Sequence, residues 1–538
     1  MKHAFPANPK VQAMLDYISA GWDVLTRSSE DCQVVADPKL TEATVLYLPA
    51  DYHATEALER ISRECNIRIA HLPAIIGQPG EIAWHAIQPE GLLFLENPYV
   101  VPGGRFNEMY GWDSYFIIRG LLRHGRLALA HNMVENFFFE IERYGSVLNA
   151  NRTYYLTRSQ PPFLSSMVLA VHEAMAAAGQ NDHRWLTRAS QYVNRDYDMW
   201  VRPPHLAGPT GLSRYCDLGE GPVHEGLHDE IDYYHDVLSY FLRTDPNSHF
   251  LVKSETRESL PNRKYSRPLS SLDSSIGEIP GSSGGAMHVA LSPEFYKGDR
   301  SMRESGFDIS FRFGPFGAET HHFAPVCLNS LLYKTEKDME EMSLLLGDTP
   351  AAARWHQCAD KRKALIQSRL WNPLQGLFFD YDFEKAQLSD YEYATTFYPL
   401  WTGLATPEQA QAVVKNLAAF EQLGGLATST LETGVQWDYP YGWAPLHLLA
   451  VEGLRRYGYH HEADRISLKF LSMVLANFER DGNLREKYNV VTDSSDIRVV
   501  EGYRGNIIGF GWTNGVFPEL WNQLPAVVQR SLGQPLVV

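Results

Sequence analysis

Apolar residues recur at helical spacing along most of the chain. Between residues 11 and 27 they fall three or four positions apart, and from Phe116 onward the pattern is helical almost throughout. It predicts helices over residues 11–27, 115–143, 163–178, 185–200, 323–346, 350–371, 407–419, 443–457 and 461–479. Residues 446–451 are apolar nearly all round, which is typical of a buried inner helix, whereas other segments keep one polar face. Paired inner and outer helices predict an all-α toroid of helical hairpins, although periodicity alone does not count the pairs.

Two stretches depart from this helical pattern. Short apolar runs at residues 45–48 and 67–70 predict strands, so residues 1–95 are expected to form a mixed N-terminal extension that packs as a cap on a main body of residues 96–538. Serine, glycine and proline are dense between residues 255 and 290. That composition predicts a loop insertion, either a lid near a site or a disordered segment.

Composition narrows the classes of function. The chain has 538 residues, of which 44% are hydrophobic and 21% charged, so it can bury a large core. Its net charge of −16 opposes binding to a phosphate backbone, which argues against nucleic acid and favours a neutral or cationic small molecule. The N-terminus has no apolar signal region, and no run of about 18 apolar residues follows, so we expect a cytoplasmic protein with no membrane partner. Five scattered cysteines predict neither a disulfide framework nor a thiolate metal site.

The stretch from residue 102 to 115, PGGRFNEMYGWDSY, combines a sharp bend with many binding groups. Pro102 fixes one φ and two glycines follow it, so a tight bend delivers Arg105 and Phe106. Two carboxylates and further aromatic rings come within the next ten residues. Such a mixture suits a sugar, because its hydroxyls need planar polar partners and its C–H faces lie on rings.

This stretch resembles the first signature of the glycoside hydrolase family 37 trehalases. Residues 436–445, QWDYPYGWAP, resemble the second signature of the same family, and the likeness extends from residues 22–27 to residues 509–515. The resemblance implies an (α/α)6 barrel and an inverting hydrolase that cleaves the α,α-1,1 bond of trehalose to two glucose molecules. It also implies a disaccharide or related glucoside as the small-molecule partner, with no cofactor and no metal, and it leaves the oligomeric state open.

The resemblance also selects two carboxylates. Residues 303–312, RESGFDISFR, resemble the segment that bears the general acid, and the resemblance places that role on Asp308. Residues 485–488, REKY, resemble the segment that bears the general base, and the resemblance places that role on Glu486. The aromatic neighbours of Asp308 would raise its pKa, as an acid at neutral pH requires, while Arg312 would lower it. Two basic neighbours, one on each side of Glu486, would favour its charged form.

Other motif positions carry over as sugar-binding groups. They are Arg105, Phe106, Trp112, Asp113, Asn149, Arg158, Ser159, Gln160, Glu225, Gly306, Gln436, Trp437, Asp438 and Glu501. For Trp437 and Trp443, core packing is an equal alternative to stacking on sugar.

One position departs from the family pattern. Val223 stands where these trehalases have an arginine that grips the second glucose, and Glu225 keeps the accompanying glutamate. An alternative function is therefore hydrolysis of another compatible-solute glucoside, such as glucosylglycerol or glucosylglycerate, with trehalose a poor substrate. A more remote alternative is a barrel that binds sugar without catalysis.

Histidine pairs raise the question of a metal. His224, Glu225 and His228 match the zinc-peptidase motif H-E-x-x-H, but Pro222 and Gly226 weaken the helix that this motif needs. The adjacent pairs 321–322 and 460–461 cannot both point inward from one helix, so we interpret them as surface or packing residues.

Overall fold

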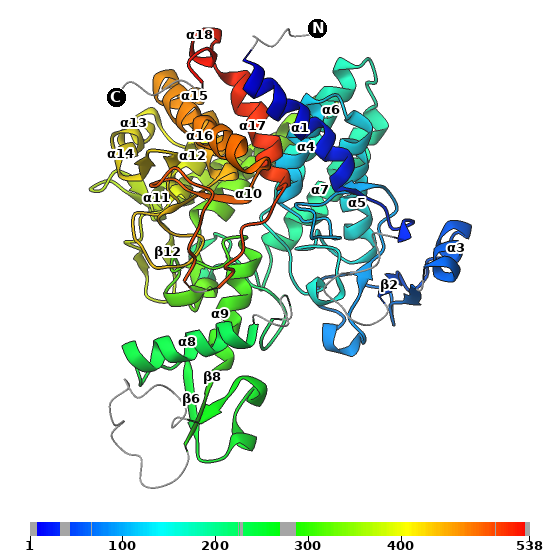
Figure 1. The fold of residues 1–538 in the computed structure, drawn as a ribbon, viewed down its shortest axis with the longest axis vertical. Coiled ribbons are helices and arrows are strands. Elements are labelled where there is room, and N and C mark those ends of the chain that lie inside the picture. Colours follow the sequence, from blue (N-terminus) through cyan, green and yellow to red (C-terminus); the bar gives the residue numbers. More distant parts are fainter. Residues whose placement is uncertain are drawn as a thin grey trace.

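The computed structural model describes residues 8–32, 44–65, 67–223, 225, 230–268, 287–500 and 502–532. Among these residues, six helices form a closed ring, and Figure 1 labels each of them. Each helix of the ring packs against the next, and the last packs against the first. In order they are α4 (Asp113–Arg123), α6 (Leu164–Ala177), α10 (Val326–Leu345), α12 (Tyr398–Trp401), α15 (Ala444–Arg456) and α17 (Gly511–Gln523). The inner helices are buried over most of their length, and in α17 every residue from Gly511 to Trp521 is buried.

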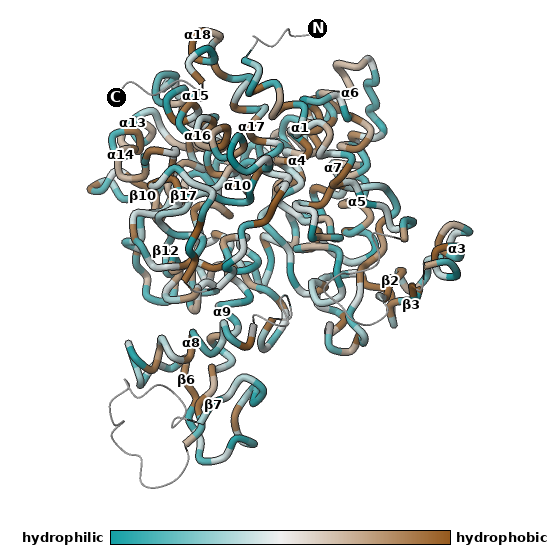
Figure 2. The backbone as a smooth tube through the Cα atoms, viewed as in Figure 1, coloured by the Kyte–Doolittle hydropathy of each residue, from teal (hydrophilic) through white to brown (hydrophobic). Residues whose placement is uncertain are grey.

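A second layer of helices surrounds this ring. It consists of α5 (Leu127–Arg143), α7 (His183–Trp200), α11 (Thr349–Arg369), α13 (Pro407–Lys415), α16 (His460–Asp481) and α1 (Pro9–Leu25). Helix α5 packs on α4 and α6, α7 on α6 and α10, α11 on α10, and both α16 and α1 on α17. Hydrophobic and hydrophilic residues alternate along the outer helices, as along α1 and α7 in Figure 2. The predicted (α/α)6 toroid is confirmed.

Local sequence signals set the ends of the outer helices. Asp182 caps α7 by accepting hydrogen bonds from the N–H groups of Arg184 and Trp185 at 2.9 and 3.0 Å. Thr406 and Gln409 form a capping box at the start of α13. Gly482 ends α16 in the left-handed conformation.

The ring closes where α17 crosses α4, and two glycines make that crossing possible. A Cβ atom on Gly515 would lie 2.0 Å from the carbonyl oxygen of Phe116, and one on Gly120 would lie 2.6 Å from the Cα atom of Gly515. Any side chain at either position would push the two backbones apart.

The N-terminal region contains a small parallel sheet beside the ring (Figure 1). Strand β2 (Val45–Leu48) lies between β3 (Arg68–His71) and β4 (Leu92–Leu93). Helix α3 (Glu56–Glu64) connects β2 to β3. Both predicted strands are confirmed, while α1 joins the outer layer of the ring. Cys32 and Cys65 form a disulfide that the sequence analysis did not expect.

A second excursion from the ring lies between α7 and α10, at the bottom of Figure 1. Helix α8 (Glu230–Thr244) precedes an antiparallel sheet in the order β6 (Leu251–Ser254), β8 (His288–Leu291), β7 (Arg267–Pro268). These elements share an apolar cluster of their own, separate from the main core. Part of the predicted 255–290 loop is therefore sheet, and residues 269–286 lie outside the described residues. Helix α9 (Pro293–Glu304) leads back toward the ring.

Short elements complete the described chain. The short strands are β1 (Thr26–Arg27), β5 (Tyr99–Val100), β9 (Phe323–Ala324), β10 (Trp371–Asn372), β11 (Leu377–Phe378), β12 (Tyr381–Asp382), β13 (Gln387–Leu388), β14 (Glu421–Gln422), β15 (Gly425–Leu426), β16 (Tyr441–Trp443) and β17 (Lys487–Asn489); the short helices are α14 (Leu417–Phe420) and α18 (Ala526–Gln529). None of the described helices is both long enough and apolar enough to cross a membrane.

Candidate active site

One pocket gathers most of the residues that the signatures pointed to. Its lining includes Arg105, Phe106, Trp112, Asp113, Asn149, Gln160, Glu225, Gly306, Asp308, Gln436, Trp437 and Glu486. It also includes residues that the sequence analysis did not select, namely Pro102, Tyr110, Tyr154, Tyr155, Arg303, Tyr503, Arg504, Gly505, Ile507, Phe510 and Trp512. Segments from residue 102 to residue 512 therefore meet in one place.

Three of the selected residues lie buried behind this lining. Arg158 donates from Nε to Asp217 at 2.8 Å and from Nη1 to Glu225, so it holds a pocket carboxylate in place. Ser159 donates to the carbonyl oxygen of Val147 at 2.6 Å. Asp438 accepts hydrogen bonds from the Ser310 hydroxyl at 2.8 Å and the Phe311 N–H at 2.9 Å, and thereby fixes the chain just after Asp308. Glu501 lies outside the described residues.

The bend after Pro102 is closed by backbone bonds. The N–H of Phe106 donates to the carbonyl oxygen of Gly103 at 2.9 Å, and the N–H of Gly511 donates to that of Pro102 at 2.5 Å. The second bond ties the bend to the start of α17. Arg105 and Phe106 are thus delivered to the pocket by the tight turn that the sequence predicted.

Burial sets the protonation of Asp308. It raises the pKa of this carboxyl to about 7, against an opposing effect of Arg303 and a further increase from Glu225. The arginine expected to oppose this shift was Arg312, but that side chain is paired with Asp380 through contacts of 2.6 and 2.7 Å. Arg303, which lines the pocket, takes over that opposing role.

Just before Asp308, the chain is packed so tightly that Gly306 has no room for a side chain. Gly306 has a φ of +75°, and a Cβ atom there would lie 2.9 Å from the indole of Trp112. Phe307 packs its ring against Trp112 and Trp437 at centroid distances of 5.7 and 5.1 Å. These contacts fix the direction in which the next residue, Asp308, enters the pocket.

The carboxylate of Glu486 is in direct contact with a cation, the ammonium of Lys487. The carboxylate accepts a hydrogen bond from this ammonium at 2.9 Å. Lys487 is fully buried and also donates to Gln436 Oε1 and to the carbonyl oxygen of Gly505, both at 2.8 Å. Gln436 in turn donates from Nε2 to the carbonyl oxygen of Asp308. One buried chain of hydrogen bonds therefore connects the backbone at one carboxylic acid to the side chain of the other.

A third carboxyl group, that of Asp113, is affected by the charges of both Asp308 and Glu486. Burial holds the pKa of Asp113 well above its usual range, and the charges of Glu486 and Asp308 raise it further. Asp113 is the first residue of α4, and it lines the same pocket. A protonated carboxyl there can donate a hydrogen bond to a bound hydroxyl.

Aromatic rings form one wall of the pocket. Trp437 lines it and stacks on Trp443, with ring centroids 3.7 Å apart and planes within 3°. Trp443 has no exposed surface, and its indole N–H donates to the carbonyl oxygen of Gln436 at 3.1 Å. Trp443 therefore packs in the core and supports Trp437, whose ring faces the pocket.

Val223 is not part of this lining. It is buried in the apolar cluster of the α8 excursion, and its N–H donates to the hydroxyl of Tyr234 at 3.0 Å. The neighbouring Glu225 contacts Arg158 and lies 3.5 Å from Arg303. Although burial alone would raise its pKa, these arginines lower the pKa of Glu225 and keep it charged. His224 and His228 of the zinc-peptidase motif lie outside the described residues.

Comparison with known proteins gives the family. The trehalase family model matches residues 24–244 and 284–524 of this chain. The chain belongs to the trehalase family. The gap between the matched ranges contains β6 and β7, whereas α8 and β8 lie within the matched ranges.

Individual relatives agree with this assignment. The cytosolic neutral trehalase of Saccharomyces cerevisiae is 38% identical over 468 residues, which is 81% of this chain and 58% of that protein. A probable trehalase of Eremothecium gossypii is 34% identical over 553 residues, 92% of this chain and 70% of that protein. This chain thus spans little more than half the length of the Saccharomyces relative.

A solved structure shares the architecture. The neutral trehalase Nth1 from Saccharomyces cerevisiae superposes with a TM-score of 0.76 at 31% identity, covering 97% of this chain and 96% of that one. The ring and its outer layer are therefore common to both chains.

Proposed function

We propose that this chain is an inverting glycoside hydrolase that cleaves the α,α-1,1 bond of trehalose into two glucose molecules. The observation that carries the proposal is the shared pocket of Asp308 and Glu486, in which one carboxyl has a pKa of about 7 and the other binds a buried ammonium. Such a pair can hold one proton for the leaving oxygen and one negative charge for the water. The family assignment, and relatives described as trehalases, support the same reaction.

The mechanism follows from these two environments. Asp308 gives its proton to the bridging oxygen as the glycosidic bond breaks, and Glu486 takes a proton from a water that attacks the opposite face of the sugar. Lys487 and Gln436 hold Glu486 relative to the Asp308 backbone during this step. Inversion requires room for the water, so the two carboxyl groups are expected to lie about 6.5–9.5 Å apart with substrate bound.

The sugar-binding roles of the selected residues are part of the proposal. Trp112 and Trp437 offer ring faces, while Arg105, Asn149 and Gln160 offer hydrogen-bonding groups from the same lining. Arg303 and Arg504 also line the pocket, so cationic donors are present even though Val223 replaces the expected arginine. Such donors can bind sugar hydroxyls, so Val223 does not argue against trehalose, and the relatives described as trehalases favour it over glucosylglycerol or glucosylglycerate.

The decisive experiment follows the anomers by proton NMR at early times. Inversion releases one β-glucose and one α-glucose from each α,α-linked trehalose, whereas retention releases two α-glucose molecules. Comparison of kcat/KM for trehalose, glucosylglycerol and glucosylglycerate, with Val223→Arg alongside, then assigns the leaving group. If none of the three substrates releases glucose, the glycosidase proposal fails and the alternative of a barrel that binds sugar without catalysis gains support.

The reaction as proposed draws both catalytic groups from the chain itself. We expect turnover at 25 °C to be unchanged after dialysis against a chelator, whereas a zinc peptidase built on His224, Glu225 and His228 would lose its activity. We also infer a cytoplasmic location, because the Saccharomyces relative is described as cytosolic.

A further inference from the structure

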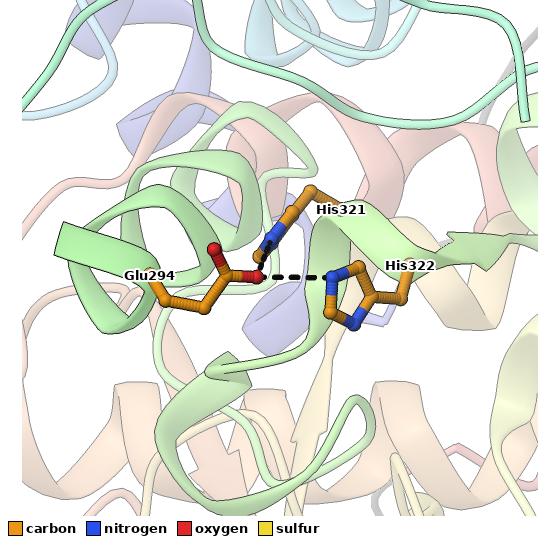
Figure 3. Close-up of side chains that lie close together, drawn as sticks. All are labelled: Glu294, His321 and His322. Atoms are coloured by element: carbon orange, nitrogen blue, oxygen red, sulfur yellow. Dashed lines mark hydrogen bonds and ion pairs between the residues drawn. The ribbon is translucent and has the colours of Figure 1, made fainter. Parts of the chain in front are cut away.

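Outside the pocket described above, three side chains of types that can bind a metal ion lie close together. Figure 3 shows Glu294, His321 and His322 pointing toward one another. The Nε2 atom of His321 lies 2.7 Å from Glu294 Oε1, and the Nε2 atom of His322 lies 3.0 Å from the same oxygen. The three candidate ligand atoms all lie within 4.8 Å of one another. None of these residues lines the proposed active site.

The backbone explains why two adjacent histidines can face one partner. His321 and His322 end a short 3-10 helix, η8 (Thr320–His322), and the chain becomes extended at Phe323. The two imidazole rings lie 4.1 Å apart at an angle of 52°. The expectation that adjacent histidines cannot both face inward applies to a regular helix, and these two residues lie at the end of a 3-10 helix instead.

The backbone at each of the three residues is held by hydrogen bonds before any ligand binds. Glu294 lies in the first turn of α9, whose N-cap Ser292 accepts a hydrogen bond from the N–H of Phe295 at 3.3 Å. The carbonyl oxygen of His321 accepts from Arg214 Nη1 at 2.8 Å, and that of His322 accepts from the N–H of Phe383 at 3.0 Å. Binding would therefore order few groups.

The ligand set and its exposure indicate which metal fits. Two imidazoles with one carboxylate match the three protein ligands of a four-coordinate zinc site whose fourth position is open. The His321 side chain is 8% exposed, against 22% for His322 and 44% for Glu294. Water can reach the cluster from the Glu294 side and supply the fourth ligand.

We propose that Glu294, His321 and His322 bind one zinc ion that fastens together the two ends of the segment 294–322. Glu294 and His321 are 27 residues apart, and Arg303, Gly306 and Asp308 all lie between them. Zinc bound only by the folded chain stabilises that chain, and a cross-link of this kind limits the separation of the ends of the segment. The ion would thus support the segment that carries the proposed general acid without taking part in hydrolysis.

The test measures zinc binding to the whole chain after dialysis against a chelator. Isothermal titration with ZnCl2 is expected to give one equivalent for the wild type, and saturating zinc is expected to raise Tm by roughly 2 °C. Glu294→Gln and His322→Gln keep a polar side chain, and each is expected to weaken zinc affinity by at least about 10-fold and to abolish the Tm rise. Tm without zinc, measured alongside, shows that each variant is folded.

Two control variants make the result specific. His461→Gln removes one of a pair of exposed histidines on α16 and should bind zinc as the wild type does. The double variant His224→Gln/His228→Gln should also bind normally. Unchanged affinity in Glu294→Gln and His322→Gln, loss of binding only in the double variant, or no binding at micromolar zinc would each overturn the proposal.

Discussion

Asp308 and Glu486 are both acidic residues in one pocket, yet their partners differ in kind. Around Asp308 burial dominates, and its pKa rises to about 7. Around Glu486 a buried ammonium contributes a direct hydrogen bond. Environment, more than residue type, can therefore assign one residue to donate a proton and the other to accept one.

The first prediction concerns Asp308 and pH. Since Asp308 must be protonated to act as the acid, kcat/KM for trehalose should fall about tenfold for each pH unit above its pKa near 7. Asp308→Asn should lower kcat by about 10²- to 10⁴-fold and remove that alkaline limb. A pH–rate profile of both proteins measures this, and an alkaline limb that survives in the variant would reassign the acid.

Asp308→Asn should lower activity but raise the stability of the folded chain. The folded-state pKa lies above the unfolded value, so the folded protein binds more protons and loses stability as pH rises from about 4 to 7. Asp308→Asn should therefore stabilise the chain by roughly 1–4 kcal/mol at pH 8 and by little at pH 4. Thermal unfolding at both pH values checks this, with the exposed Asp360→Asn as the control.

The second prediction concerns Lys487, which positions Glu486. Lys487→Met removes the ammonium that donates to Glu486 and leaves Gln436 Oε1 and the Gly505 carbonyl without this donor. We expect kcat to fall about 10- to 100-fold, because the carboxylate loses the hydrogen bond that positions it. Lys10→Met, at an exposed lysine, is the matched control. A lower Tm with an unchanged kcat would reduce Lys487 to a packing role.

Sequence resemblance found many of the pocket residues that stand in signatures, and the structure added others, some of them outside any signature. Tyr503 and Arg504 belong to a stretch with no distinctive composition, and only folding brings them beside Arg303. Likewise, Glu294 becomes a neighbour of His321 only through the return of the chain after α9. No spacing in the sequence encodes such contacts.

At the level of elements, periodicity located helices with regular apolar stripes and missed several others, among them α17, α9 and α12. Helix α17 contains Gly511, Gly515 and Pro518, residues that normally indicate a loop, yet every residue from Gly511 to Trp521 is buried. Helix α9 is rich in charged residues, and most of them are buried in ion pairs and hydrogen bonds. Helix α12 has four residues, too few to show a period. Tertiary packing forms these helices.

The third prediction tests the glycines where α17 crosses α4. A Cβ atom on Gly515 would overlap the Phe116 carbonyl, so Gly515→Ala should destabilise the chain by about 1–3 kcal/mol and lower kcat, because α17 begins beside the pocket. Gly21→Ala in α1 is the matched control, since a Cβ atom there meets its nearest neighbour at 3.7 Å. That control should be neutral or stabilising by up to about 1 kcal/mol. Urea unfolding and steady-state kinetics separate the two variants.

For the whole molecule, the ring joins the two ends of the described chain. Helix α1 packs on α16 and α17, and Asn8 donates from its side chain to the carbonyl oxygen of Leu532 at 3.1 Å. Trp22 of α1 has no exposed surface, and its indole N–H donates to His124 Nδ1 at 3.2 Å. The division at residue 95 stays a prediction, and α1 provides a way to test it.

The fourth prediction uses Trp22 for that test. Trp22→Ala should cost about 3–5 kcal/mol and shift the unfolding midpoint of the entire ring, because α1 is part of its outer layer. Val24→Ala, at a side chain that is 70% exposed, should stay within about 0.5 kcal/mol of the wild type. If residues 1–95 form an independent cap, Trp22→Ala would instead produce a separate early transition and leave the activity of the ring intact.

The contact between α4 and α17 also has a consequence during protein synthesis. The ribosome completes α4 at residue 123 and begins α17 only at residue 511, so at about 5–20 residues per second roughly 20–80 s separate the two partners. Throughout that interval the apolar side of α4 that will meet α17 has no partner from this chain, and such surface favours aggregation. A nascent chain of this kind would depend on chaperones until its last large helix emerges.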